Sequence, residues 1–230
     1  MVVEIFPVTG LPEVEPGDDL TALLVEAVSP LGPRPGDILV VTHKVVSKAE
    51  GAMAPARTDE DYRNAVASEA VSIVRRRRDM VIAVTRHGFV CANAGVDRSN
   101  VTGDRVVLLP RDPDRSAHRI RNRLLRDLGV DLAVVISDTF GRAWRTGVVD
   151  VAIGISGIRP ILDLKGTTDM HGRTLEVTEV AIADEVAAAA ELVMGKSTGI
   201  AAALIRGVAY EPGIGRASEL VRDPNEDMFR

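Results

Sequence analysis

The chain has 230 residues, of which 46% are apolar, with one cysteine and a formal net charge of −5. This length and apolar content predict one large domain, or two intimately packed subdomains, with a substantial core. The negative charge argues against a protein that mainly coats nucleic acid, and the single Cys91 excludes an internal disulfide. Because no apolar stretch is as long as a membrane span and no basic leader is evident, we expect a cytoplasmic protein.

Apolar and turn-forming segments alternate along the chain and predict an α/β or mixed α+β fold without internal repeats. The periodicity predicts helices over residues 20–28, 61–77, 114–128 and 178–194. Strands are expected over residues 2–6, 38–42, 80–84, 89–94, 106–109, 132–136, 148–155 and 201–205.

A loop near the start of the chain, residues 10–14, has a backbone that could embrace a base or a ribose. The turn that follows contains Asp18 and Asp19, and either could cap the helix that begins at Leu20.

The strand at residues 38–42 runs directly into a polar and basic segment, residues 43–51. Lys48 in this segment suits a point-charge contact with phosphate. An ordinary surface lysine is the alternative interpretation.

Four arginines, residues 75–78, close the amphipathic segment that begins at Asp61. We interpret them as a solvated cationic helix end that complements the helix dipole. A patch that binds a polyanion is the alternative.

The small-residue strand at 88–94 resembles one arm of a hairpin and leads into an acidic loop that contains Asp97 and Asn100. Both side chains could face one ligand, and an Asx-turn is the alternative interpretation of Asp97. Cys91, four residues after His87, is expected to be a small buried hydrophobe rather than a nucleophile.

The most informative segment is residues 134–145, where an apolar run ends in a carboxylate, a hydroxyl and two guanidiniums. We expect Asp138 just past the carboxyl end of a buried strand, where it could hold a hard divalent cation together with Thr139. Gly141 would permit a tight turn or a close backbone approach. The site candidates for phosphate or substrate anions are Arg142 and Arg145.

Three further acids are ambiguous. Asp150 could be a buried partner of Arg142 or Arg145, or a third acidic ligand. Asp184 or Glu185 could reach a cleft, although capping and solubility explain most charges of their helix.

Several of these segments together, in this order, resemble the coenzyme F420:L-glutamate ligase family. The resemblance is carried by Leu11-Pro12-Glu13, residues 44–51, residues 86–100, residues 137–145 and residues 179–185. It spans nearly the whole chain.

The resemblance implies a GTP-dependent amide ligase that adds L-glutamate to the terminal carboxylate of coenzyme F420-0, and then adds further γ-linked glutamates. It implies Mg²⁺ or Mn²⁺ as cofactor, with two divalent ions, and help from K⁺. It also implies an unusual mixed fold of two subdomains in an intertwined homodimer, with no nucleic acid or membrane as partner.

The resemblance also implies roles for particular residues. Metal positions would be Asp97, Asp138 and Thr139, and catalysis would depend on Asp138, Asp97 and Lys48. GTP positions would be Leu11, Pro12, Glu13, Val14, Lys48, Asn100 and His43, where relatives often carry Ser. A late acid of the site is assigned to Glu211.

The residues read by themselves fit this chemistry, because joining a carboxylate to an amine requires an activated carboxylate. Phosphoryl transfer from GTP would give an acyl phosphate, and such transfer depends on positioning and on neutralised phosphate charge. The alternatives are a related ligase for another polycarboxylate and a GTP-binding and metal-binding regulatory module without catalysis.

Overall fold

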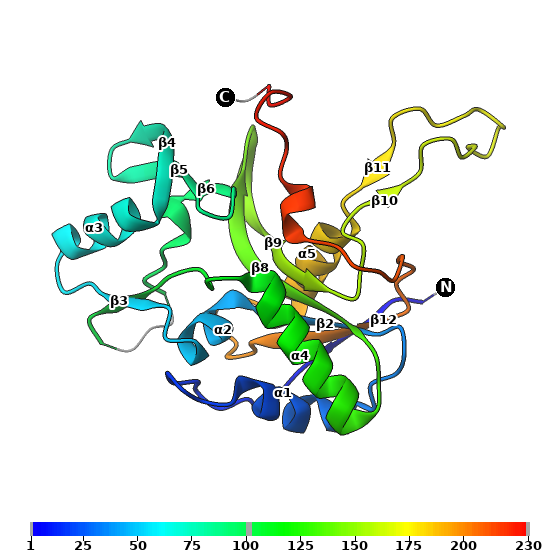
Figure 1. The fold of residues 1–230 in the computed structure, drawn as a ribbon, viewed down its shortest axis with the longest axis horizontal. Helices are drawn as coiled ribbons and strands as arrows, with labels where there is room; N and C mark the ends of the chain where they lie inside the picture. Colours follow the sequence, from blue (N-terminus) through cyan, green and yellow to red (C-terminus); the bar gives the residue numbers. More distant parts are fainter. Residues whose placement is uncertain (1, 100–102, 229–230) are drawn as a thin grey trace.

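The computed structural model describes residues 2–99 and 103–228. A mixed sheet lies at the centre of the fold formed by these residues (Figure 1). We call it the central sheet; its order is β1-β12-β2-β8-β9. Strands β2 and β8 are parallel, whereas the other neighbouring pairs are antiparallel. The strands are β1 (Glu4–Pro7), β12 (Ala202–Arg206), β2 (Ile38–Thr42), β8 (Ala133–Arg142) and β9 (Arg145–Ser156).

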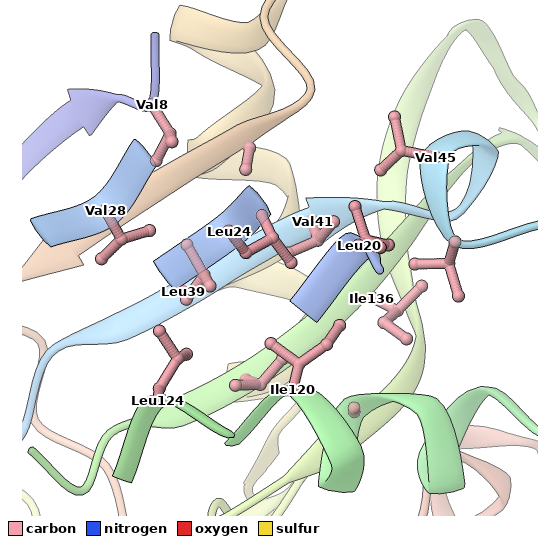
Figure 2. Packing of buried hydrophobic residues seen from close by; sticks show 14 of the residues in the cluster. Val8, Leu20, Leu24, Val28, Leu39, Val41, Val45, Ile120, Leu124 and Ile136 are labelled. Carbon is pink, nitrogen blue, oxygen red and sulfur yellow. The ribbon is translucent and has the colours of Figure 1, made fainter. Parts of the chain in front are cut away.

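Helices cover both faces of the central sheet. One face packs against α1 (Leu20–Val28) and α4 (Pro113–Leu128), and the other packs against α5 (Ile182–Met194). Figure 2 shows the first of these cores, in which Leu24 of α1 and Ile120 of α4 lie among strand residues. The molecule is therefore layered as helix, sheet and helix.

Strand alternation assigns each residue of β8 to one of these two cores, because successive side chains point to opposite faces. Val134 and Ile136 pack with α1 and α4, whereas Ala133 and Val135 pack with α5. This alternation continues in the polar half of β8, where it determines on which face of the sheet each polar side chain lies.

Capping aspartates explain where two of the helices begin. The Asp19 carboxylate accepts a hydrogen bond from the amide of Ala22, at 3.1 Å, and the Asp112 carboxylate accepts one from the amide of Arg115, at 3.0 Å. Each satisfies an amide that has no partner within its helix. The predicted cap at Asp19 is confirmed.

A second, smaller group of elements lies beside the central sheet (Figure 1). Strands β4, β5 and β6 form an antiparallel sheet, which we call the outer sheet, and α3 packs beside it over a small apolar core. The elements of this part are β3 (Met53–Pro55), α3 (Asp59–Glu69), β4 (Ala70–Arg77), β5 (Met80–Thr85), β6 (Val90–Ala92), η2 (Asn93–Gly95) and β7 (Arg105–Val107).

The remaining elements are short. Strands β10 and β11 pair at the base of an arm that extends away from the body in Figure 1. They are β10 (Leu162–Asp163) and β11 (Glu179–Val180), and the others are α2 (His43–Ala49), η1 (Ser29–Leu31) and η3 (Ala217–Leu220). Across the described residues, no helix combines the length and apolarity needed to cross a membrane.

The mixed α/β class and most strands are as predicted, but the helix predicted over residues 61–77 is wrong in its second half. It ends at Glu69, and the following residues form β4, which pairs with β5. The β-branched Val71 and Ile73 favour a strand once a neighbouring strand is present. The four arginines 75–78 therefore lie in and after a strand, and they do not form a helix end.

Two other predicted boundaries are also corrected. The helix predicted from residue 178 begins at Ile182, because residues 179–180 pair with β10. The strand predicted to end at Ile136 continues to Arg142, because β9 pairs with it over its whole length. Gly141 consequently lies inside β8, and the turn of this hairpin falls at residues 143–144.

Candidate functional site

The parallel pairing of β2 and β8 brings two polar segments together. Thr42 lies opposite Ser137, so the residues that follow on each chain segment, His43 and Asp138, become neighbours. His43 Nε2 lies 3.2 Å from Asp138 Oδ1, and His43 Nδ1 lies 3.4 Å from Ser47 Oγ. His43 is fully buried and Asp138 is 8% exposed. Asp138 is therefore held inside the sheet and not on a loop after it.

The contact between His43 and Asp138 is close but poorly aligned for a hydrogen bond. Within the described residues, His43 Nε2 has no hydrogen-bond partner. The Asp138 carboxylate accepts a hydrogen bond from the amide of Thr139, at 2.7 Å, through the same oxygen.

The Asp97 loop lies on the same side of the sheet. Asp97 forms a β-bridge with Val107, and its carboxylate accepts hydrogen bonds from the amide and the hydroxyl of Ser99, at 2.6 and 2.9 Å. The predicted Asx-turn is therefore present. The same carboxylate also forms an ion pair with Lys44, whose Nζ lies 2.9 Å from Oδ2.

Electrostatics favour the ionised form of Asp97. Partial burial raises the pKa of this carboxyl, but the hydrogen bonds from Ser99 and the Lys44 ammonium outweigh burial and hold the pKa below its ordinary value of 3.8. At neutral pH this group is an anion that faces a cation.

Asp97 and Asp138 line one cavity of about 580 Å³. Burial, together with the negative charge of Asp138, raises the pKa of the Cys91 thiol to about 12. Cys91 is thus a neutral thiol, as expected of a small buried hydrophobe. The lining residues are Tyr62, Cys91, Ala92, Asn93, Gly95, Val96, Asp97, Arg98, Ser99, Asp138, Thr139 and Phe140.

Thr139 points to the opposite face of the sheet from Asp138. Asp138 lies between Ile136 and Phe140, which pack on the α1 and α4 side. Thr139 lies opposite Asp150 in the β8–β9 pairing, and its hydroxyl donates to Asp150 Oδ1 at 2.7 Å. Thr139 still borders the cavity, but its hydroxyl bonds to Asp150 and does not lie beside the Asp138 carboxylate.

Asp150 is buried and surrounded by donors. It accepts hydrogen bonds from Ser137 Oγ at 3.0 Å, from Thr139, and from Lys196 Nζ at 2.8 Å. Neither Arg142 nor Arg145 is its ion-pair partner, as one interpretation of the sequence suggested, because Lys196 takes that position. Burial lowers the pKa of Lys196, but the bonds to Asp150 and Glu191 outweigh it and raise the pKa overall.

The loop at residues 11–14 is anchored beside α2. Val14 is buried and Leu11 packs against the core of α1 and α4. Glu13 is exposed, and its carboxylate accepts a hydrogen bond from the Lys48 ammonium. Lys48 is 7% exposed, so it is not an ordinary surface lysine. The structure thus brings the predicted base-binding loop and the predicted phosphate contact together.

Other predicted site residues lie elsewhere. Arg142 and Arg145 lie opposite each other in the strand register at the end of the β8–β9 hairpin. This position is about 13 Å along the strand from Asp138. Glu211 forms an exposed ion pair with Arg159, 2.9 Å apart. Asp184 accepts a hydrogen bond from the amide of Ala152 and supports β9. Asn100 lies outside the described residues.

The carboxylate oxygens at the cavity suit a hard cation that takes most of its other ligands from phosphate and water. In the parts of the chain that the structure describes, no three His, Cys, Asp or Glu side chains cluster as a metal site. Mg²⁺ usually takes one or two carboxylates and completes its shell with phosphate oxygens and water. Asp97, whose carboxylate is paired with Lys44, and Asp138 supply two such carboxylates on one face, whereas the neutral Thr139 hydroxyl accepts from the Lys196 ammonium on the other.

The sequence patterns did not single out two lysines of the site, Lys44 and Lys196. Lys44 lies one helical turn before Lys48 on α2, and this i, i+4 spacing was a usable signal, hidden because α2 was not predicted. Lys196 lies in a polar segment after α5, and its only signal was that a buried Asp150 requires a positive partner.

Comparison with known proteins gives a consistent result over the whole chain. A model of the family described as F420-0:Gamma-glutamyl ligase matches residues 10–207. The protein named coenzyme F420:L-glutamate ligase from Methanothermobacter thermautotrophicus is 42% identical over 251 aligned residues, which cover 100% of both chains. Proteins of the same name from Methanopyrus kandleri and Archaeoglobus fulgidus are 43% and 40% identical; the alignments cover 99% and 100% of this chain and 98% and 97% of theirs.

Proposed function

The chain belongs to the F420-0:gamma-glutamyl ligase family, and we propose that it is a GTP-dependent ligase that joins L-glutamate to coenzyme F420-0. The observation that carries the nucleotide and metal part of this proposal is that two carboxylates from different elements line one cavity beside α2, the helix that carries Lys44 and Lys48. Asp97 and Asp138 share one cavity, Lys44 contacts Asp97, and Lys48 contacts the loop at residues 11–14.

The reaction would proceed in two steps. The terminal carboxylate of the acceptor attacks the γ-phosphorus of GTP, the bond from that phosphorus to the bridging oxygen breaks, and an acyl phosphate and GDP form. The amine of L-glutamate then attacks the acyl carbon, inorganic phosphate leaves, and the amine loses a proton as the amide forms. Further glutamates would be added by the same steps through γ-linkages.

The charged side chains would mainly position and neutralise the phosphates, which is the principal task in phosphoryl transfer. Asp97 and Asp138 would hold Mg²⁺ or Mn²⁺, which when bound neutralises charge on the phosphates. Lys48 is buried beside residues 11–14 and would contact a phosphate from that side. His43 lies against Asp138 and would keep this carboxylate in place.

We also propose that the chain works as an intertwined homodimer in which each copy contributes a central-sheet subdomain and an outer-sheet subdomain. Projecting parts of the chain carry exposed apolar side chains, which supports this proposal. Trp144 at the β8–β9 turn is 85% exposed, and Met170 and Val177 on the arm are 91% and 82% exposed. Arg142, Arg145 and Glu211 would then act across the interface. Light scattering coupled to size-exclusion chromatography, which should give twice the 24.6 kDa chain mass, is the test.

The experiment that tests the function is mass spectrometry of products after incubation with GTP, Mn²⁺, K⁺, L-glutamate and unglutamylated coenzyme F420. We expect mass gains of whole glutamate residues that require GTP and are lost in the Asp138→Asn variant. The Arg126→Met variant, altered in an exposed ion pair on α4, is the control and should retain activity. Activity with ATP and not with GTP would refute the nucleotide assignment, and no mass gain with any nucleotide would refute the ligase.

A further inference from the structure

Lys196 is bound to the same hydroxyl that the family resemblance assigns to a metal ion. Its Nζ lies 2.7 Å from Thr139 Oγ1, 2.8 Å from Asp150 Oδ1 and 3.1 Å from Glu191 Oε1. An ammonium has three donors and no acceptor, so three oxygen atoms complete its contacts. Two of these oxygens belong to carboxylates, which makes this position favourable for a cation.

The Thr139 hydroxyl is already engaged in two hydrogen bonds. It donates its proton to Asp150, at 2.7 Å, and it accepts from Lys196. A divalent ion on the remaining lone pair would share this oxygen with the ammonium, and the two positive charges would repel each other.

The charge balance around Asp150 leads to the same conclusion. Asp150 is 3% exposed, and a buried carboxylate requires a positive partner. Lys196 supplies that charge, and the hydroxyls of Ser137 and Thr139 complete the contacts of the carboxylate. Asp138 lies on the other face of the sheet, so its charge is left for a different cation.

We propose that the Lys196 ammonium is a built-in cation that takes the place of a second divalent ion beside Thr139. This inference rests on the proposed function and changes one expectation that comes with the family, namely two divalent ions per site. The protein would hold one divalent ion, bound by Asp97 and Asp138 on the opposite face of β8. Lys196 is thus a positioning residue that orders Thr139 and Asp150 without occupying the cavity.

The test is to count the Mn²⁺ ions bound per chain in the presence of GDP, using the electron paramagnetic resonance signal of free Mn²⁺. We expect about one ion for the wild-type protein and about two for Lys196→Met, because the freed Thr139, Asp150 and Glu191 oxygens then offer a hard-cation site. Lys196→Arg keeps the positive charge and should bind about one ion. Arg126→Met removes one positive charge from an exposed pair on α4 and should also bind about one.

Two Mn²⁺ ions on the wild-type chain would overturn the inference, and so would a single ion on a folded Lys196→Met chain. Circular dichroism melting verifies folding, and Lys196→Gln serves as a second neutral variant if Lys196→Met does not fold. The glutamylation assay on the same samples separates this inference from the proposed function. Product formation with two bound ions refutes only the role of Lys196, whereas no product and no bound ion refutes both.

Discussion

The central sheet and the region of the outer sheet each supply one carboxylate to the candidate site, and they hold it in different ways. The Asp138 side chain is 10% exposed, and strand register places it between two apolar residues against the buried His43. The Asp97 side chain is 33% exposed, and a turn and an ion pair with Lys44 hold it. The candidate site therefore combines one carboxylate that the core holds rigidly with one carboxylate on a loop that only local contacts hold.

The largest expected effect is a loss of stability when a side chain of the central sheet is truncated, compared with the same change in the outer sheet. Ile136→Ala should lower the free energy of unfolding by about 2–5 kcal/mol, because it leaves a cavity in the core of α1 and α4. Ile73→Ala on the outer sheet should cost no more than about 0.5 kcal/mol, because this side chain is 52% exposed. Urea denaturation of both variants measures the difference. Equal losses would mean that the outer sheet is covered in solution.

The second prediction compares the two carboxylates in catalysis. Asp138→Asn should lower kcat by about 100-fold or more, equivalent to about 2.7 kcal/mol, because a rigid strand cannot bring another ligand to the ion. Asp97→Asn should lower activity by about 10-fold, and raised Mn²⁺ should restore part of it, because the loop can move. Steady-state kinetics across a Mn²⁺ series measure both effects. Full rescue of Asp138→Asn by metal would contradict the rigid role.

The third prediction concerns the buried acid on the other face of the central sheet. Asp150→Asn should lower the free energy of unfolding by about 1–3 kcal/mol, because an amide cannot accept all three hydrogen bonds and leaves Lys196 without its main partner. Chemical denaturation measures the loss. The exposed Asp163→Asn change is the control, and a loss of similar size there would refute the assignment.

The smallest expected effect is the pH dependence of the Asp97 contribution. Since the folded pKa lies below 3.8, the stabilisation is fully present above the unfolded value and is lost as the pH falls through the folded value. Asp97→Asn should therefore cost less than about 1 kcal/mol at neutral pH and almost nothing at low pH. Urea denaturation of the wild-type protein and the variant at about pH 6 and about pH 3 measures this difference in the free energy of unfolding. A stability difference between the two proteins that grows as the pH falls would contradict this prediction.

Local patterns in the sequence were sufficient for much of the architecture. β-Branched runs predicted the buried strands of the central sheet, and an acidic cap predicted the start of α1. The prediction failed where a partner strand decides between helix and strand, as at residues 70–77, where pairing with β5 overrides the helical pattern. It failed again at β8, whose last six residues are polar or small except for Phe140 and are extended because β9 pairs with them.

The sequence by itself determined the mixed α/β class and the residue types of the site, because hydrophobic periodicity, capping and charged motifs are local properties of the chain. Only the tertiary structure decided that Asp138 shares a cavity with Asp97 while Thr139 contacts Asp150 and Lys196. Two neighbouring residues of a strand point to opposite faces once the strand is extended, and their partners come from segments far away along the chain. Such pairings depend on register and packing, which no local pattern encodes.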